Sequence, residues 1–104
     1  MKNIDAAELH SLQQSGPVVL IDVRTDAEVA RGMIPNARHL PLHLLPHRVA
    51  ELDPAATTVI YCQSGGRSAQ ACAWLEGHGF DSLMNLQGGI IGWVREGHPV
   101  EAPR

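Results

Sequence analysis

The chain has 104 residues, which is enough for one hydrophobic core but too few for two domains. Its formal net charge of -3 gives no long-range attraction for nucleic acid or an anionic membrane surface, so neither is expected as a partner. No apolar stretch has the length of a transmembrane helix, and the acidic start of the chain has no apolar core like that of a signal peptide. The expected location is cytoplasmic.

The first half of the chain predicts two helices and two strands. Asp5 can cap a helix over residues 5–14, with Glu8 at the capping-box position. Residues 18–22 form a continuous apolar run, typical of a strand that is buried on both faces. A short helix is expected to open at residue 25 and to end at Gly32, and a short strand is expected over residues 39–41.

The second half continues the alternation. Helices are expected over residues 46–52, 68–78 and 90–96, and strands over residues 57–61 and 82–85. Strands that alternate with helices predict a mostly parallel sheet with helices on both faces. The expected architecture is therefore a single α/β domain over residues 1–104, and ligands in such sheets bind beyond the carboxyl ends of the strands.

The strongest functional signal is Cys62, which stands where the strand 57–61 gives way to a glycine-rich loop. Backbone N–H groups along such a loop can form a nest for an anion, and the following helix adds the positive end of its dipole. These surroundings lower the pKa of a thiol, so Cys62 is predicted to be the catalytic nucleophile. The predicted substrate-binding loop consists of Gln63, Ser64, Gly65, Gly66, Arg67 and Ser68.

A buried structural cysteine is the alternative interpretation of Cys62. Two adjacent glycines and an arginine are poor material for an inert core turn, whereas they suit close approach of the backbone to an anion. The loop therefore favours a reactive cysteine.

The loop resembles that of the rhodanese-like family, which reads Cys-x-Ser-Gly-x-Arg-Ser/Thr. Three further segments, residues 18–28, 32–37 and 86–93, are similar to the family's DVR…E, GHIPGA and GG-x-x-x-W signatures. The resemblance covers nearly the whole chain and implies a single rhodanese-like domain with a five-stranded, mostly parallel sheet. Met33 stands where the family usually has histidine, and Asn36 where it often has glycine; asparagine can still adopt a left-handed conformation.

This resemblance implies a sulfurtransferase of the thiosulfate type, which needs no cofactor or metal. A Cys62 thiolate would take the outer sulfur of thiosulfate or a related small donor. It would then pass that sulfur from a persulfide to cyanide or a thiol. Four residues separate Cys62 from Arg67, whereas the related phosphatase-type loops have five and a wider cradle for phosphate or arsenate. A Cys-dependent phosphatase or arsenate reductase, and a non-catalytic binding module, remain the alternatives.

Three charged residues are expected to support the loop. Asp22 and Arg24 follow the strand 18–22, and Glu28 lies four residues after Arg24. Charges at the end of a buried strand are costly unless they are paired. The expected arrangement is an ion-pair scaffold, for instance between Arg24 and Glu28, that braces the active loop.

The remaining thiol and the histidines predict no second site. Cys72 lies within the helix 68–78, too far along it for a disulfide with Cys62, so it is expected to pack in the core as a free thiol. His39, His43 and His47 are spaced by four residues, but Pro41 and Pro46 interrupt any helix that would align them. No metal site is expected there.

Overall fold

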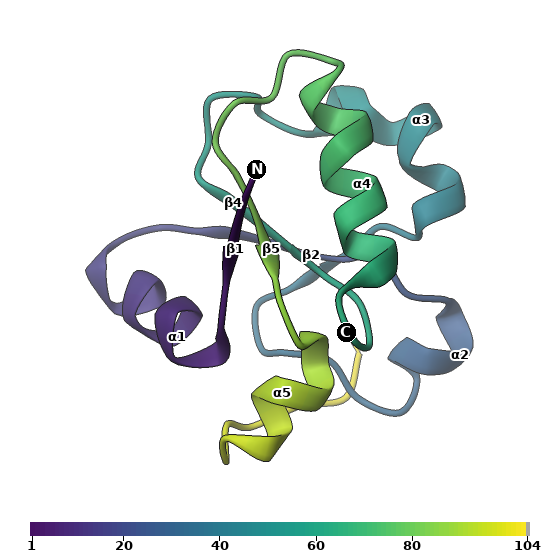
Figure 1. Ribbon diagram of the computed structural model, residues 1–104. Coiled ribbons are helices and arrows are strands. Elements are labelled where there is room, and N and C mark those ends of the chain that lie inside the picture. Colours follow the sequence, from purple (N-terminus) through teal and green to yellow (C-terminus); the bar gives the residue numbers. More distant parts are fainter. Residues whose placement is uncertain (104) are drawn as a thin grey trace.

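The computed structural model describes residues 1–103 (Figure 1). Its strands are β1 (Lys2–Ile4), β2 (Val19–Asp22), β3 (Arg38–His39), β4 (Thr58–Tyr61) and β5 (Leu83–Leu86). The α-helices are α1 (Ala6–Ser15), α2 (Asp26–Val29), α3 (Leu45–Arg48), α4 (Gly66–Glu76) and α5 (Gly89–Arg95). Two 3₁₀ turns, η1 (Leu42–Leu44) and η2 (Val49–Glu51), flank α3.

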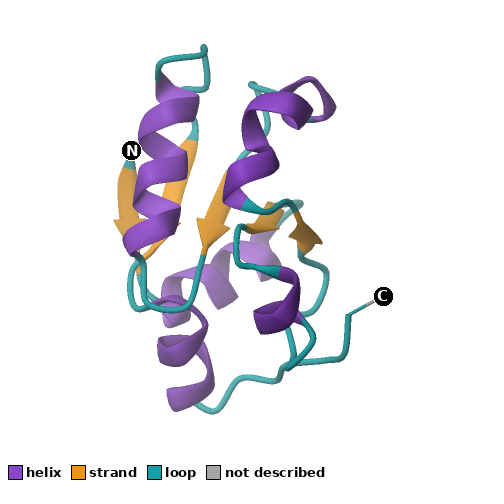
Figure 2. Cartoon of the chain, turned by 90° about the vertical axis from the view of Figure 1, so that its right-hand side faces the viewer, coloured by secondary structure: helices purple, strands orange, loops and turns teal. Residues whose placement is uncertain are grey.

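The five strands form one sheet in the order β1-β5-β4-β2-β3, and every pairing is parallel. Valine, leucine and isoleucine make up most of β2 and half of β4, and such apolar content suits strands covered on both faces. Because the strands are parallel, their carboxyl ends meet at one edge of the sheet. Figure 2 shows the arrowheads pointing toward the end of the molecule where α2 and α5 lie.

Alternate side chains of the strands enter two separate apolar cores. Ile21 of β2 and Ile60 of β4 point to the face that α3 and α4 cover. Their sequence neighbours Leu20 and Val59 point to the opposite face, which α1 and α5 cover. The alternation is the two-residue period of a β-strand, and it confirms the predicted parallel sheet with helices on both faces.

Most predicted elements are present, with three differences. The strand β1 was not located in the sequence, because only Ile4 of its three residues is buried. The helix expected over residues 46–52 is a succession of η1, α3 and η2 that begins earlier, at Leu42. The helix expected to open at Ser68 begins two residues sooner, at Gly66. The capping box of Asp5 and Glu8 is confirmed.

Among residues 1–103, no helix is both long enough and apolar enough to cross a membrane.

Candidate active site

Cys62 follows β4 directly and lies at the carboxyl edge of the sheet, as predicted. Its side chain is buried at the floor of the loop, with the sulfur 3.1 Å from the backbone nitrogen of Gly65 and 3.5 Å from the hydroxyl oxygen of Ser68. Gly65 reaches this position with a φ of 111°, in the left-handed region that favours glycine. The loop thus turns N–H and O–H donors onto one sulfur atom.

These donors make Cys62 more acidic than an ordinary thiol. Burial works to raise the pKa of Cys62, but hydrogen bonds from the Ser68 hydroxyl and the loop amides outweigh it. The net pKa is lowered, because a thiolate accepts these bonds more strongly than a thiol does. The geometry therefore favours the nucleophilic form that the sequence predicted.

Asn85 supports the loop from below, a role that sequence reasoning did not find. Its side-chain oxygen lies 2.5 Å from the Ser68 hydroxyl, and its amide nitrogen donates to the carbonyl of Gly65 and to the side chain of Asn3. Asn85 is 4% exposed within the apolar strand β5. The sequence did offer a signal, because Asn85 is a polar residue inside the apolar strand 83–86 and a buried polar side chain needs a hydrogen-bond partner.

Ser68 does not cap helix α4, although a serine at the start of a helix often does. Gly65 is the N-cap residue of α4, and Ser68 lies inside the first turn of the helix, fully buried. Its single hydroxyl proton faces two acceptors, Asn85 at 2.5 Å and Cys62 at 3.5 Å. Ser68 can therefore donate to the sulfur when a negative charge develops there.

Arg67 and Glu28 form a two-bonded ion pair that joins α4 to α2. The guanidinium nitrogens of Arg67 lie 2.6 and 2.7 Å from the two carboxylate oxygens of Glu28. The same carboxylate accepts from the backbone and hydroxyl of Thr25, which completes the capping box of α2. Hydrogen bonding to Arg67 lowers the pKa of Glu28 to about 2. Both hydrogen bonds of the Arg67 guanidinium thus go to Glu28, and Arg67 acts on Cys62 only through space.

The expected Arg24–Glu28 ion pair is wrong. Arg24 pairs instead with Asp22, at 2.8 Å, and both side chains are almost fully buried. It also donates to the backbone carbonyls of Glu28 and Gly32, because the segment after α2 folds back over the guanidinium. Asp22 and Arg24 thus hold the segment that presents Glu28 to Arg67.

The amino end of α5 packs directly on the active loop. The backbone nitrogens of Ile90 and Ile91 donate to the carbonyls of Cys62 and Gln63, at 3.0 and 3.2 Å. This approach requires Gly89, which has a φ of 57° and whose added Cβ would lie 2.3 Å from the Gln63 carbonyl oxygen. In contrast, no atom lies within 4 Å of a Cβ added at Gly66, the second glycine of the active loop.

Cys72 packs in the core as predicted. It is fully buried among Ile21, Ile60 and Leu75, and neither cysteine forms a disulfide. Burial raises the pKa of Cys72 to about 11, so the two thiols differ in reactivity.

The histidines do not form a metal site within residues 1–103. A ring nitrogen of His39 lies 2.7 Å from the backbone carbonyl oxygen of Arg24. Over residues 1–103, no cluster of histidine, cysteine or carboxylate side chains could hold a metal.

The model of the rhodanese-like domain matches residues 5–96 of the chain. This chain belongs to the rhodanese-like family. It is 48% identical over 104 residues to a protein of Allochromatium vinosum named sulfurtransferase, a match that covers 99% of this chain and 97% of that one. Both the predicted family and the predicted fold are confirmed.

Solved structures agree. A rhodanese-like domain protein from Staphylococcus aureus has a TM-score of 0.89 and 38% identity, and the match covers 100% of both chains. A rhodanese-related protein from Thermoplasma volcanium has a TM-score of 0.88 and 30% identity over 97% of this chain and 98% of its own.

The two departures from the family signature are accommodated within this rhodanese-like fold. Asn36 has a φ of 70°, so it does adopt the left-handed conformation of the glycine it replaces. Met33 is buried, and its backbone pairs with Glu101 in an isolated antiparallel bridge. Neither residue contributes to the donors around Cys62.

Proposed function

We propose that this protein moves a sulfane sulfur from thiosulfate, or a related small donor, to a thiophilic acceptor through a persulfide on Cys62. In the first half-reaction the Cys62 thiolate attacks the outer sulfur of thiosulfate. The bond between the two sulfur atoms of thiosulfate breaks, and sulfite leaves with the bonding electrons. In the second half-reaction cyanide or a thiol attacks the outer sulfur, and Cys62 recovers its thiolate.

The observation that supports this most strongly is the set of donors on one buried sulfur. Gly65 donates at 3.1 Å, and Ser68 lies at 3.5 Å with a proton it can redirect. Such donors stabilise the thiolate and the anionic persulfide alike. The proposed reaction moves sulfur without net oxidation of the protein, so the loop donors and one thiolate supply what it requires.

Enzyme assays separate this proposal from the phosphatase or arsenate reductase alternative. Purified protein is incubated with thiosulfate and cyanide, and thiocyanate is measured. Parallel reactions contain p-nitrophenyl phosphate, or arsenate with a thiol reductant. We expect thiocyanate at a rate that scales with protein concentration and only background turnover of the two oxyanion substrates. Turnover of either oxyanion without thiocyanate would replace the proposal by the alternative, and no turnover would favour a binding module.

We also propose a cytoplasmic location with small-molecule partners only. A reactive thiol and a second free thiol suit a reducing compartment. The formal net charge of -3 offers no general attraction for nucleic acid.

The Arg67–Glu28 pair predicts opposite effects from its two members. Arg67→Gln removes a positive charge near the loop, so the KM for thiosulfate should rise about fivefold to tenfold and Cys62 should react with iodoacetamide only at a higher pH. Glu28→Gln leaves Arg67 unpaired and available to the donor anion. The KM for thiosulfate should therefore fall, and Cys62 should react with iodoacetamide at a lower pH. Steady-state kinetics and the pH profile of alkylation measure them.

Arg48→Gln serves as the control, because it breaks a comparable arginine–carboxylate pair, with Glu51, on the exposed surface. It should change neither quantity. If Arg67→Gln and Glu28→Gln both lower activity and neither shifts the pH profile of Cys62 alkylation, Arg67 holds the loop in shape and does not bind the donor.

A further inference from the structure

Asn85 contacts both of the residues that donate to the Cys62 sulfur. Its amide nitrogen lies 3.3 Å from the carbonyl oxygen of Gly65, and its amide oxygen lies 2.5 Å from the hydroxyl oxygen of Ser68. The N–H of Gly65 and the hydroxyl of Ser68 are in turn the donors found 3.1 and 3.5 Å from the sulfur. Asn85 comes from β5, the strand beside β4, so it reaches the loop from a neighbouring strand. One buried side chain therefore connects the two donors.

The partners of Asn85 fix the direction in which its amide faces. A backbone carbonyl can only accept, so the amide nitrogen must face Gly65 and the amide oxygen must face Ser68. The second amide proton goes to the side-chain oxygen of Asn3, at 3.1 Å. Since both N–H bonds of the amide are used, its oxygen can act toward Ser68 only as an acceptor.

The Ser68 hydroxyl therefore has one proton and two acceptors, the amide oxygen of Asn85 and the sulfur of Cys62. Both Ser68 and Asn85 are buried. Rotation about the Cβ–Oγ bond of Ser68 carries the proton from one acceptor to the other without moving a heavy atom. A neutral thiol, or the inner sulfur of a persulfide, is a weak acceptor, whereas a thiolate is a strong one. The proton should follow the charge on the sulfur.

We propose that Asn85 is a positioning residue for sulfur transfer, because it accepts the Ser68 hydroxyl whenever the sulfur of Cys62 is uncharged. This inference rests on the proposed function. When the thiolate attacks thiosulfate, the inner sulfur loses its charge and the hydroxyl turns to Asn85. When the acceptor removes the outer sulfur, the bonding electrons return to Cys62 and the hydroxyl turns back. Without Asn85 the hydroxyl would have no strong acceptor in the persulfide state, and a buried unpaired donor is costly.

Asn85→Leu tests this role, since leucine is close in shape to asparagine but accepts no hydrogen bond. The carbonyl of Gly65 keeps its bond from the backbone nitrogen of Ala69, at 3.2 Å, so the loop retains an anchor. The neutral forms of Cys62 should become less stable relative to the thiolate. The pH midpoint of Cys62 alkylation by iodoacetamide should therefore fall by about one unit. A loop that merely came loose would lose donors, and its midpoint would rise.

The two half-reactions should change in opposite directions. Sulfur loading by thiosulfate and discharge by cyanide are each followed by mass spectrometry, at a pH above both alkylation midpoints. In Asn85→Leu the ratio of the loading rate constant to the discharge rate constant should fall by about tenfold, because loading ends in the persulfide and discharge starts from it. A residue that only holds the fold would change both rate constants alike and leave their ratio at the parent value.

A double-mutant cycle shows whether the effect passes through the hydroxyl. In a Ser68→Ala protein the hydroxyl is absent, so the addition of Asn85→Leu should shift the alkylation midpoint by less than about a third of a unit. Asn3→Ala is the matched control. It removes an exposed partner of the Asn85 amide and leaves the acceptor of Ser68 in place. It should keep the parent midpoint and the parent ratio of rate constants.

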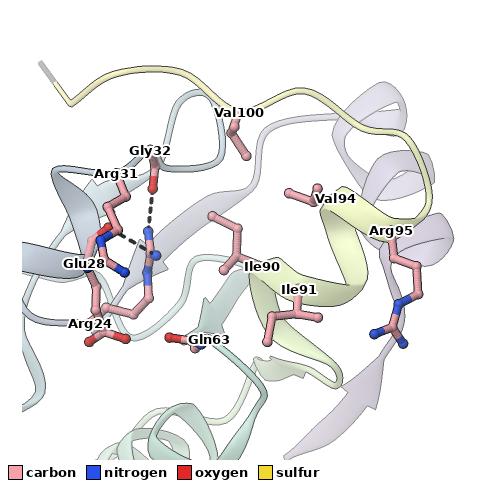
Figure 3. A pocket seen from close by; sticks show the side chains of 10 residues that line it. All are labelled: Arg24, Glu28, Arg31, Gly32, Gln63, Ile90, Ile91, Val94, Arg95 and Val100. Carbon is pink, nitrogen blue, oxygen red and sulfur yellow. Dashed lines mark hydrogen bonds between the residues drawn. The ribbon is translucent and has the colours of Figure 1, made fainter.

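The charged groups near the loop are the same in the parent protein and in these variants. Arg67 of α4 pairs with Glu28 of α2. Arg24 pairs with Asp22 and donates to the carbonyls of Glu28 and Gly32 (Figure 3). Their effect on the nucleophile is therefore common to all the proteins compared, and the differences measure the hydrogen bonds at the sulfur.

Asn85→Val is measured alongside Asn85→Leu, so that the test stands if leucine prevents folding; circular dichroism checks each variant. In a folded apolar variant, a midpoint that stays or rises, an unchanged ratio of rate constants, or an equal shift in the Ser68→Ala background would overturn the role of Asn85 while the proposed function stands. If thiosulfate cannot load the parent protein, the proposed function itself fails, whereas the alkylation midpoint still reports whether Asn85 holds the Ser68 hydroxyl.

Discussion

Replacing Cys62 with serine is expected to abolish thiosulfate:cyanide sulfur transfer, with turnover below about 1% of the parent rate. An alkoxide cannot form at neutral pH in this loop, and oxygen is a far poorer acceptor of sulfane sulfur than a thiolate. The folded state should persist, because serine is close in size to cysteine and the donors of Gly65 and Ser68 can bond its oxygen. Thiocyanate formation measures activity, and circular dichroism checks the fold.

Cys72→Ala is the matched control. It removes the other thiol, which lies in the core with its pKa raised to about 11, so it should retain activity within about twofold of the parent protein in its folded fraction. Turnover by Cys62→Ser above a few per cent of the parent rate would show that Cys62 is not the nucleophile. Loss of turnover in a folded Cys72→Ala would show that Cys72 also takes part in the transfer.

Gly89→Ala is the second change with a large expected effect, although Gly89 is buried and has no side chain that could take part in the reaction. The added Cβ would lie 2.3 Å from the carbonyl oxygen of Gln63 and 2.6 Å from that of Cys62, on a backbone with a φ of 57°. The overpacking and the unfavourable backbone conformation should lower the free energy of unfolding by about 2–4 kcal/mol. Displacement of the loop should also reduce kcat/KM by about tenfold to a hundredfold. Urea unfolding and steady-state kinetics measure the two effects.

Gly92→Ala provides the comparison within the same helix. No atom lies within 4 Å of a Cβ added at Gly92, so the substitution should raise the free energy of unfolding by about 0.5–1 kcal/mol through helix propensity and leave activity unchanged. An active Gly89→Ala with parent-like stability would mean that α5 does not hold the loop as the structure indicates.

The sequence predicted the features that depend on local chemistry. The apolar run 18–22 and the capping box at Asp5 are signals within a few residues, and both elements formed as expected. The residue types also predicted the local geometry at two other places, the glycine-rich loop after Cys62 and the turn at Asn36. The buried state of Cys72 followed from its place on an amphipathic helix.

Features that depend on distant residues could not be predicted in the same way. Glu28 pairs with Arg67, 39 positions along the chain, rather than with Arg24, four positions before it. Arg24 is drawn instead to Asp22, whose buried carboxylate needs a partner of its own. Strand β1 has only three residues and pairs with β5, near the other end of the chain. Residues 2–4 form a strand because of this pairing, since their own sequence shows no clear strand pattern. Asn85 likewise supports Ser68 and Gly65, which lie 17 and 20 positions before it in the sequence, so this contact also depends on the folded chain.

The mass of the protein after exposure to thiosulfate tests the central claim most directly. The protein is treated with excess thiosulfate, freed of it without reductant, alkylated, digested and mapped. We expect one added sulfur atom, about 32 Da, on the peptide that contains Cys62 and none on the peptide that contains Cys72, because only Cys62 has loop donors that favour its thiolate. The added mass should disappear on treatment with cyanide. An added sulfur on Cys72, or on neither cysteine, would contradict the account.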